Sequence, residues 1–146
     1  MLLTSYLSNF RAEKMTSQDF IDQFEDCSLP VENWTHAGHI HTALWYVHHH
    51  GLDAALCFLR SGIIRYNASV GGENTPTGGY HETLTIFWAE AVARFDEGLD
   101  QDLSFGERWE AAQKSHLMDK ELAFQSYSKA HLMSTKARGR WVEPDL

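Results

Sequence analysis

Apolar residues recur at helical spacing in one segment after another of this 146-residue chain. The widest apolar stripe lies in residues 80–97, where apolar residues return at intervals of three and four: Leu84, Phe87, Trp88, Ala91, Val92 and Phe95. Alternation with a period of two never extends beyond a few residues. This pattern predicts an all-α, single-domain bundle of about five to six helices and argues against an all-β fold.

Capping signals mark where these helices begin. The stretches Thr16-Ser-Gln-Asp19 and Ser104-Phe-Gly-Glu107 have the form of capping boxes and predict helices over residues 16–26 and 104–115. Three further N-caps are predicted for the remaining helices, at Asn33, Asp53 and Asp119. We therefore expect helices over 33–50 and 53–67, and a last helix carrying a stripe of four residues: Leu122, Phe124, Tyr127 and Leu132.

Three segments are predicted to lie outside the helices. The first fifteen residues lack strong periodicity and are expected to be a loose arm preceding the domain at 16–146. Residues 70–79 contain four glycines and a proline, a composition typical of a loop, which we expect to act as a mobile cover. Residues 141–146 are expected to form an extended strap, with Trp141 docked on the bundle.

The charge balance limits the partners. Twelve Lys and Arg stand against 20 Asp and Glu, and the formal charge of −8 repels nucleic acids and anionic membranes. No run approaches the ~20 apolar residues of a membrane span, and the N-terminus lacks the features of a signal peptide. We expect a cytoplasmic protein that binds neither nucleic acid nor membrane, and the oligomeric state stays open.

Topology predicts a functional site at one end of the bundle. The helices over 33–50 and 53–67 are joined by a short turn and should pack antiparallel, and the helix over 80–97 should return antiparallel again. His36, His39 and His81 then meet at one end. Candidate ligand-binding residues at the same end are Arg65, Tyr66, Asn67 and Thr85.

Three imidazoles near one point favour a divalent transition metal, such as zinc, iron or nickel. Glu82 is the candidate catalytic residue, as a base acting on a metal-bound water, although the sequence does not decide whether the protein is an enzyme. A structural role also stays open, because a chain with nine histidines produces such pairs by chance. A glutamate in the first turn of a helix is, moreover, favourable without any function.

Two other functions remain open. One is a metal-free pocket for a small anionic molecule, bound by the two helix N-termini with help from Arg65. The other is an interaction protein without chemistry, whose five tryptophans mostly fill the core.

Three motifs resemble a family of small, uncharacterised bacterial helical proteins. They are Trp34-Thr-His36-Ala-Gly-His39-Ile, Tyr80-His81-Glu82-Thr83-Leu-Thr85 and Ala137-Arg138-Gly-Arg-Trp141-Val-Glu-Pro144-Asp145-Leu146. The resemblance runs from about residue 30 to the C-terminus. It implies that His36, His39, His81 and Glu82 are the positions to test. Members of that family often carry arginine at the position of His41, which makes His41 a weaker candidate.

Overall fold

The protein is all-α in the computed structural model, which describes residues 15–146, and no strand occurs among these residues. The longer helices are α2 (Ser17–Glu25), α3 (His36–His50), α4 (Leu52–Ser69), α5 (Glu82–Glu97) and α6 (Phe105–Gln113). The shorter ones are η1 (Val31–Asn33), η2 (His116–Met118), η3 (Leu122–Gln125), α7 (Lys129–Leu132) and α8 (Thr135–Gly139).

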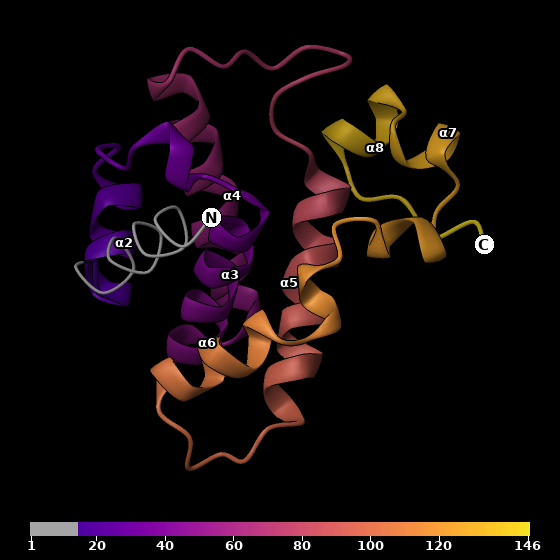
Figure 1. The fold of residues 1–146 in the computed structure, drawn as a ribbon. Helices are drawn as coiled ribbons and strands as arrows, with labels where there is room; N and C mark the ends of the chain where they lie inside the picture. Colours follow the sequence, from indigo (N-terminus) through magenta and orange to yellow (C-terminus); the bar gives the residue numbers. More distant parts are fainter. Residues whose placement is uncertain (1–14) are drawn as a thin grey trace, which may run out of the picture.

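Helices α3, α4 and α5 form the centre of the molecule. Each packs against the other two. Helix α2 covers the α3–α4 pair, and α6 covers α3. Helix α4 runs antiparallel to α3 and α5, so α3 and α5 both start at the end that loop 70–79 crosses (Figure 1). The predicted up, down, up order is therefore present. The main core cluster contains fully buried residues from these helices, among them Ile40, Leu44, Tyr66 and Val92.

The two predicted capping boxes both form. Thr16 Oγ1 accepts the Asp19 N–H at 3.0 Å, and Ser104 Oγ accepts the Glu107 N–H at 3.2 Å. Each acidic side chain in turn accepts the backbone N–H of its N-cap residue. The predicted cap at Asn33 is wrong. Asn33 ends the turn η1, and the hydroxyl of Thr35 caps α3 instead. Asp53 is also not a cap, because α4 begins one residue earlier, directly after Gly51.

Helices α2 and α4 touch closely at a glycine. A Cβ added to Gly62 would lie 2.7 Å from Cε2 of Phe24, whose ring is fully buried. Glycine is therefore required at position 62 by packing, since a buried ring has no room to move away.

The predicted last helix, capped by Asp119, is wrong. Residues 116–139 fold instead as the short helices η2, η3, α7 and α8. Ser128 and Ser134 interrupt any longer helix, because each hydroxyl accepts the N–H three residues later and starts a new turn. Residues 119–146, which we call the C-terminal lobe, gather around a small second core with five buried residues: Ala123, Tyr127, Leu132, Ala137 and Val142.

Residues 141–146 are extended, as predicted, but Trp141 does not anchor them. Its side chain is 45% exposed, whereas its neighbour Val142 is only 6% exposed. The Tyr127 hydroxyl donates to the Val142 carbonyl at 2.7 Å. Val142 is therefore the residue that docks the strap.

The predicted N-terminal arm lies outside the described residues, apart from Met15, which packs against the main core. No helix among the described residues is both long and apolar enough to span a membrane.

Candidate functional site

His36 and His39 lie in the first turn of α3, and each is tied to a backbone carbonyl. His36 Nε2 donates to the Leu117 carbonyl at 2.8 Å, and His39 Nδ1 donates to the Thr35 carbonyl at 2.7 Å. Because a carbonyl can only accept, these bonds fix which nitrogen carries the proton. The other nitrogens, His36 Nδ1 and His39 Nε2, have no hydrogen-bond partner among the described residues.

The two imidazoles rest on tryptophan rings. His39 lies over Trp34 with the ring centroids 3.9 Å apart, and His36 meets Trp88 of α5 at 4.7 Å. Burial lowers the pKa of His39, the bond to Thr35 opposes this, and the nearby His36 lowers the pKa further. His39 is therefore neutral at pH 7.

His81 has no nitrogen free for a ligand. Its Nε2 donates to the Leu132 carbonyl at 2.8 Å, and its Nδ1 accepts the Leu84 N–H at 3.1 Å as the N-cap of α5. Burial lowers its pKa, the bond to Leu132 opposes this, and Arg138 lowers the pKa further, so the ring is neutral. His81 holds the C-terminal lobe onto the start of α5.

The described residues do not fit the predicted metal site of His36, His39 and His81. No group of three His, Cys, Asp or Glu side chains within residues 15–146 is arranged to hold a metal ion. His36 contacts Trp88, which lies seven residues beyond His81 along α5, or about 10 Å at 1.5 Å per residue. His81 is also committed through both nitrogens to backbone groups. The shared helix end was predicted, but the convergence of three free imidazoles does not occur.

Glu82, the predicted catalytic base, is held in an ion pair between α4 and α5. Arg60 binds it in a bidentate manner, with its Nε 2.9 Å from Oε1 and its Nη2 2.8 Å from Oε2, and the Tyr80 hydroxyl donates at 2.6 Å. Burial raises the pKa of Glu82, but the bonds from Arg60 and Tyr80 and the charge of Arg60 outweigh it, and the pKa lies below its usual value. A carboxylate with a lowered pKa is a weak base, so this geometry favours a structural role.

The other four predicted ligand-binding residues do not form one site. Tyr66 is fully buried and donates to the Leu29 carbonyl at 2.8 Å, and Thr85 donates to the His81 carbonyl at 2.9 Å. The Asn67 carbonyl accepts the Gly72 N–H where loop 70–79 leaves α4. Arg65 is exposed on α4 and makes no ion pair with the described residues.

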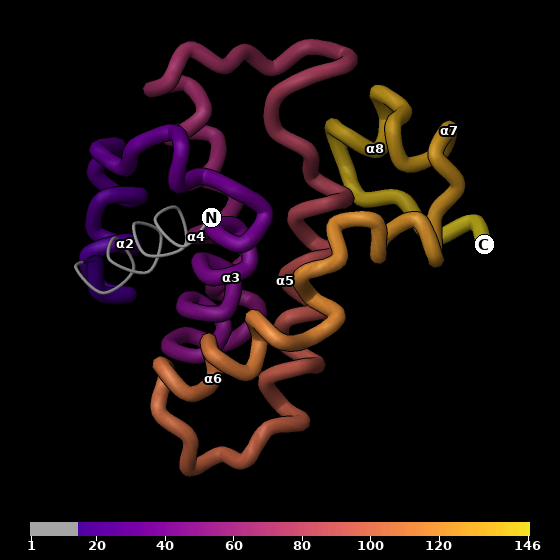
Figure 2. The backbone as a smooth tube through the Cα atoms, in the orientation of Figure 1, coloured from indigo at the N-terminus to yellow at the C-terminus, as the bar shows by residue number. Residues whose placement is uncertain are grey.

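Loop 70–79 crosses from α4 to α5 over one end of the bundle (Figure 2). Its residues 70–77 are exposed. Gly79 has φ +86°, and a Cβ there would lie 2.6 Å from Asn74 Oδ1, so the turn requires glycine at this position. Arg138 of α8 donates to the Gly79 carbonyl at 3.3 Å. The loop is thereby linked to the C-terminal lobe, and its behaviour as a cover stays a prediction.

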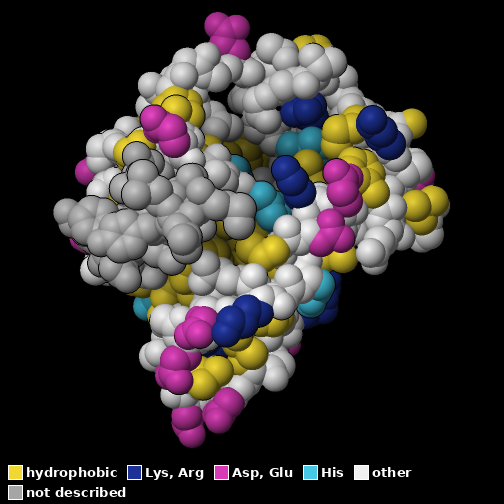
Figure 3. All heavy atoms as spheres, viewed as in Figure 1, with side chains coloured by type: hydrophobic (Ala, Val, Ile, Leu, Met, Phe, Trp, Pro, Cys, Tyr) yellow, Lys and Arg dark blue, Asp and Glu magenta, His cyan; other side chains and the backbone are white. Residues whose placement is uncertain are grey.

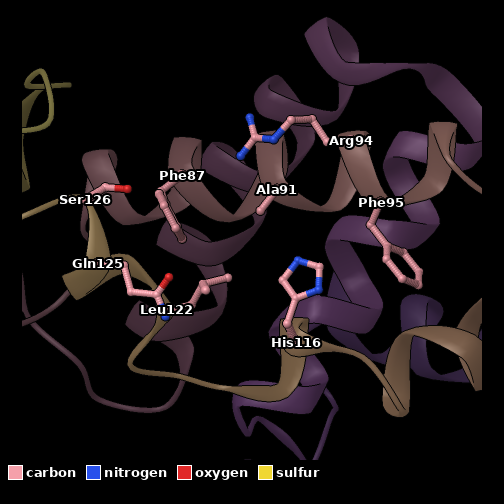
Figure 4. A pocket seen from close by; sticks show the side chains of 8 residues that line it. All are labelled: Phe87, Ala91, Arg94, Phe95, His116, Leu122, Gln125 and Ser126. Carbon is pink, nitrogen blue, oxygen red and sulfur yellow. The ribbon is translucent and has the colours of Figure 1, made fainter.

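A groove lies between α5 and the segment 116–126 (Figure 4). This segment crosses α5 on its way to α7 and α8 (Figure 2). Its volume is about 350 Å³, and eight residues line this α5 groove: Phe87, Ala91, Arg94, Phe95, His116, Leu122, Gln125 and Ser126. The four residues from α5 lie at positions i, i+4, i+7 and i+8, which is one face of a helix.

The α5 groove combines an apolar wall with polar groups. In Figure 4 Phe87, Ala91 and Phe95 extend from α5 toward the opposite wall, where His116, Leu122 and Gln125 lie, and the Arg94 guanidinium lies on the α5 side. Arg94 forms no ion pair with any Asp or Glu of residues 15–146. No hydrogen bond to a described residue occupies the His116 ring or the Gln125 amide.

Charges are unevenly distributed over the surface. On the face shown in Figure 3, acidic side chains gather at the end where α6 lies, and exposed acidic residues there include Asp100, Asp102, Glu107 and Glu110. Histidine and Lys or Arg side chains gather instead around the hollow in the upper centre of that face.

The α5 groove was not predicted from the sequence. Phe87, Ala91 and Phe95 were recognised as part of one wide apolar stripe, but no groove was expected along it. The available signal was Arg94, a cation next to the stripe, one turn from Ala91 and two turns from Phe87. The opposite wall was not recognised, because Leu122 was expected in one long helix capped by Asp119, whereas it belongs to the short helix η3.

No protein-family model, curated protein or solved structure matches this chain. The function is therefore argued from the geometry of the chain's own residues.

Proposed function

We propose that this protein binds a small organic anion with an apolar body in the α5 groove. The observation that carries the proposal is Arg94, a guanidinium without an ion pair among the described residues, at the edge of an apolar groove of about 350 Å³. That volume is at the lower end of the range for small-molecule sites, which are mostly apolar with a few polar groups that set the orientation.

Each part of such a ligand has a partner in the α5 groove. An apolar body would cover Phe87, Ala91 and Leu122 and would gain from the water it displaces. A carboxylate would pair with the Arg94 guanidinium, whose planar fork suits two parallel hydrogen bonds. Gln125 could donate to the same anion from the opposite wall.

The proposal is tested by isothermal titration calorimetry with 3-phenylpropionate and its neutral amide, 3-phenylpropanamide. We expect the carboxylate to bind more tightly, and Arg94→Gln to reduce its affinity by about tenfold, in line with a lost charge-assisted hydrogen bond. The amide should bind both proteins equally. Arg65→Gln is the matched control, because Arg65 is also an exposed arginine without an ion pair among residues 15–146.

The control separates the two anion sites under consideration. An unchanged affinity in Arg65→Gln with a loss in Arg94→Gln supports the α5 groove. The reverse result would move the anion site to the end of α4, where the sequence first suggested it, and would refute the proposal.

A second candidate is binding of a divalent transition metal by His36 and His39. The supporting observation is that each ring donates one N–H to a carbonyl and leaves the other nitrogen without a partner among the described residues, the usual arrangement of a metal-ligating histidine. Elemental analysis of protein purified without an affinity tag tests it. Stoichiometric metal that is lost in His39→Ala but retained in His49→Ala would support this candidate, and metal retained in both variants would contradict it.

A further inference from the structure

His36 contacts residues that adjoin both walls of the α5 groove, although it does not line the groove itself. Its Nε2 donates to the carbonyl of Leu117, the central residue of η2. The residue before Leu117 is His116, which lines the groove. On the other side, the His36 ring meets Trp88, and Trp88 meets the groove residue Phe87 edge to face at 5.1 Å.

Apart from the bond to His36, the hydrogen bonds of η2 are local. The Met118 N–H donates to the Ser115 carbonyl at 3.2 Å, the Asp119 N–H to the His116 carbonyl at 3.0 Å, and the Leu117 N–H to the Ser115 hydroxyl at 3.1 Å. Leu117 is fully buried, so its carbonyl needs a partner, and His36 provides it. Without that bond, a buried acceptor would have to find water, and the turn would have to move.

We propose that His36 is a positioning residue for the ligand: it sets the distance between the η2 wall and the α5 wall of the groove. This inference rests on the proposed function. His36 acts through the Leu117 carbonyl, and so on the place of the His116 ring, while its contact with Trp88 fixes the position of η2 relative to α5. The histidine of the Trp34-Thr-His36 motif is in this way coupled to a site more than fifty residues later in the chain.

A matched pair of amides tests the role of the hydrogen bond. In His36→Gln the side-chain N–H₂ can reach the place of Nε2, whereas in His36→Asn it is one methylene too short to reach Leu117. We expect His36→Asn to weaken binding of 3-phenylpropionate by about fivefold to tenfold, the size of one neutral hydrogen bond, and His36→Gln to stay within about threefold of the wild type. Equal affinities in the two variants would overturn the proposal.

His81→Asn is the control for a general loss of stability. It removes a histidine bond of the same kind, from Nε2 to the Leu132 carbonyl, and that bond holds the C-terminal lobe rather than η2. We expect a lower Tm and an affinity within twofold of the wild type. An affinity that falls in proportion to Tm in all three variants would mean that His36 acts only through stability, and would refute a positioning role.

Hydrogen exchange in the absence of ligand separates this inference from the proposed function. The amide N–H groups of Met118 and Asp119 donate to the backbone carbonyls of Ser115 and His116, respectively, and so report on η2. They should exchange faster in His36→Asn than in His36→Gln, whether or not 3-phenylpropionate binds. Faster exchange without any binding by the wild type would refute only the α5 groove as the ligand site. Equal exchange in the two variants would refute the positioning role even if the ligand binds.

Discussion

Acid should destabilise this protein through His41, a buried imidazole that stays neutral in the folded state. The ring is only 5% exposed and is surrounded by aromatic rings, with Phe20 at 4.8 Å, Trp109 at 5.0 Å and Phe105 at 5.5 Å. Nε2 is hydrogen-bonded to Ser17 Oγ at 2.9 Å, and Nδ1 has no partner among the described residues. Burial lowers the pKa of His41 to about 4.

The sign and size of the effect follow from this pKa. The unfolded chain binds a proton at His41 below about pH 6.5, whereas the folded protein does so only near pH 4, so the unfolded state holds more protons between these values. Stability is therefore complete above pH 6.5 and falls as the pH drops toward 4. At 1.36 kcal/mol per pKa unit, the loss from this one residue amounts to about 3 kcal/mol.

Urea unfolding at pH 7.5 and pH 4.5 measures the effect in the wild type and in His41→Phe, which cannot take up a proton. Burial also lowers the pKa of His39, His48 and His81, but these histidines are present in both proteins and cancel in the comparison. The wild type should lose about 2 to 3 kcal/mol more than the variant on acidification. An equal loss in both proteins, or an NMR titration of His41 with a midpoint near 6.5, would refute the reasoning.

Three substitutions test the packing that holds the site. Thr83→Val should destabilise the protein by about 2 to 3 kcal/mol, because the buried Thr83 hydroxyl lies 2.8 Å from the Ala137 carbonyl and accepts the Val142 N–H at 3.2 Å. Gly62→Ala should cost about 1 to 3 kcal/mol through overpacking. Arg108→Met should lower the free energy of unfolding by about 3 to 5 kcal/mol, since it removes the buried guanidinium that lies 2.6 Å from the carboxylate of Asp96, which is itself largely buried. Urea unfolding measures all three, and Thr83→Ser, which keeps the hydroxyl, should be close to the wild type.

A change below about 0.5 kcal/mol would contradict the reasoning in each case, because that is the range of surface substitutions. For Thr83 the comparison is sharper, since a larger loss in the serine variant than in the valine variant would mean that the methyl group, and not the hydroxyl, carries the effect.

Local signals in the sequence predicted the helices well where side chain and backbone interact within one turn. The boxes at Thr16 and Ser104 are of this kind, and both helices start where predicted. The N-cap predicted at Asn33 was wrong because Thr35, two residues later, is an equally good cap, and only packing decides between the two. The long helix predicted from Asp119 does not form, because Ser128 and Ser134 each start a new turn. The turns that follow bind partners far away in the chain.

The candidate site was predicted in part. The shared end of α3 and α5 followed from loop lengths and helix order. The state of each imidazole did not, because its partner is a backbone carbonyl far away in sequence: Leu117 for His36 and Leu132 for His81. Those two carbonyls belong to the short turns η2 and α7, whose positions depend on packing, so no pattern in the sequence indicated that these histidines already had hydrogen-bond partners.

The same reason explains why the α5 groove was missed. A groove between a helix and an irregular segment exists only once the segment has been placed, and here His36 and Trp88 contribute to placing it. A stripe such as Phe87, Ala91 and Phe95 looks the same in sequence whether its partner fills the space or leaves it open.

The most direct test of the account is to locate the bound anion by NMR. A titration of ¹⁵N-labelled protein with 3-phenylpropionate should shift the backbone amide signals of Ala91, Arg94, Leu122 and Ser126, on the two walls of the α5 groove. The signals of His39 and Arg65 should stay in place. Shifts confined to His39, Arg65 and their neighbours, or no shifts at all, would contradict the claim that the α5 groove is the ligand site.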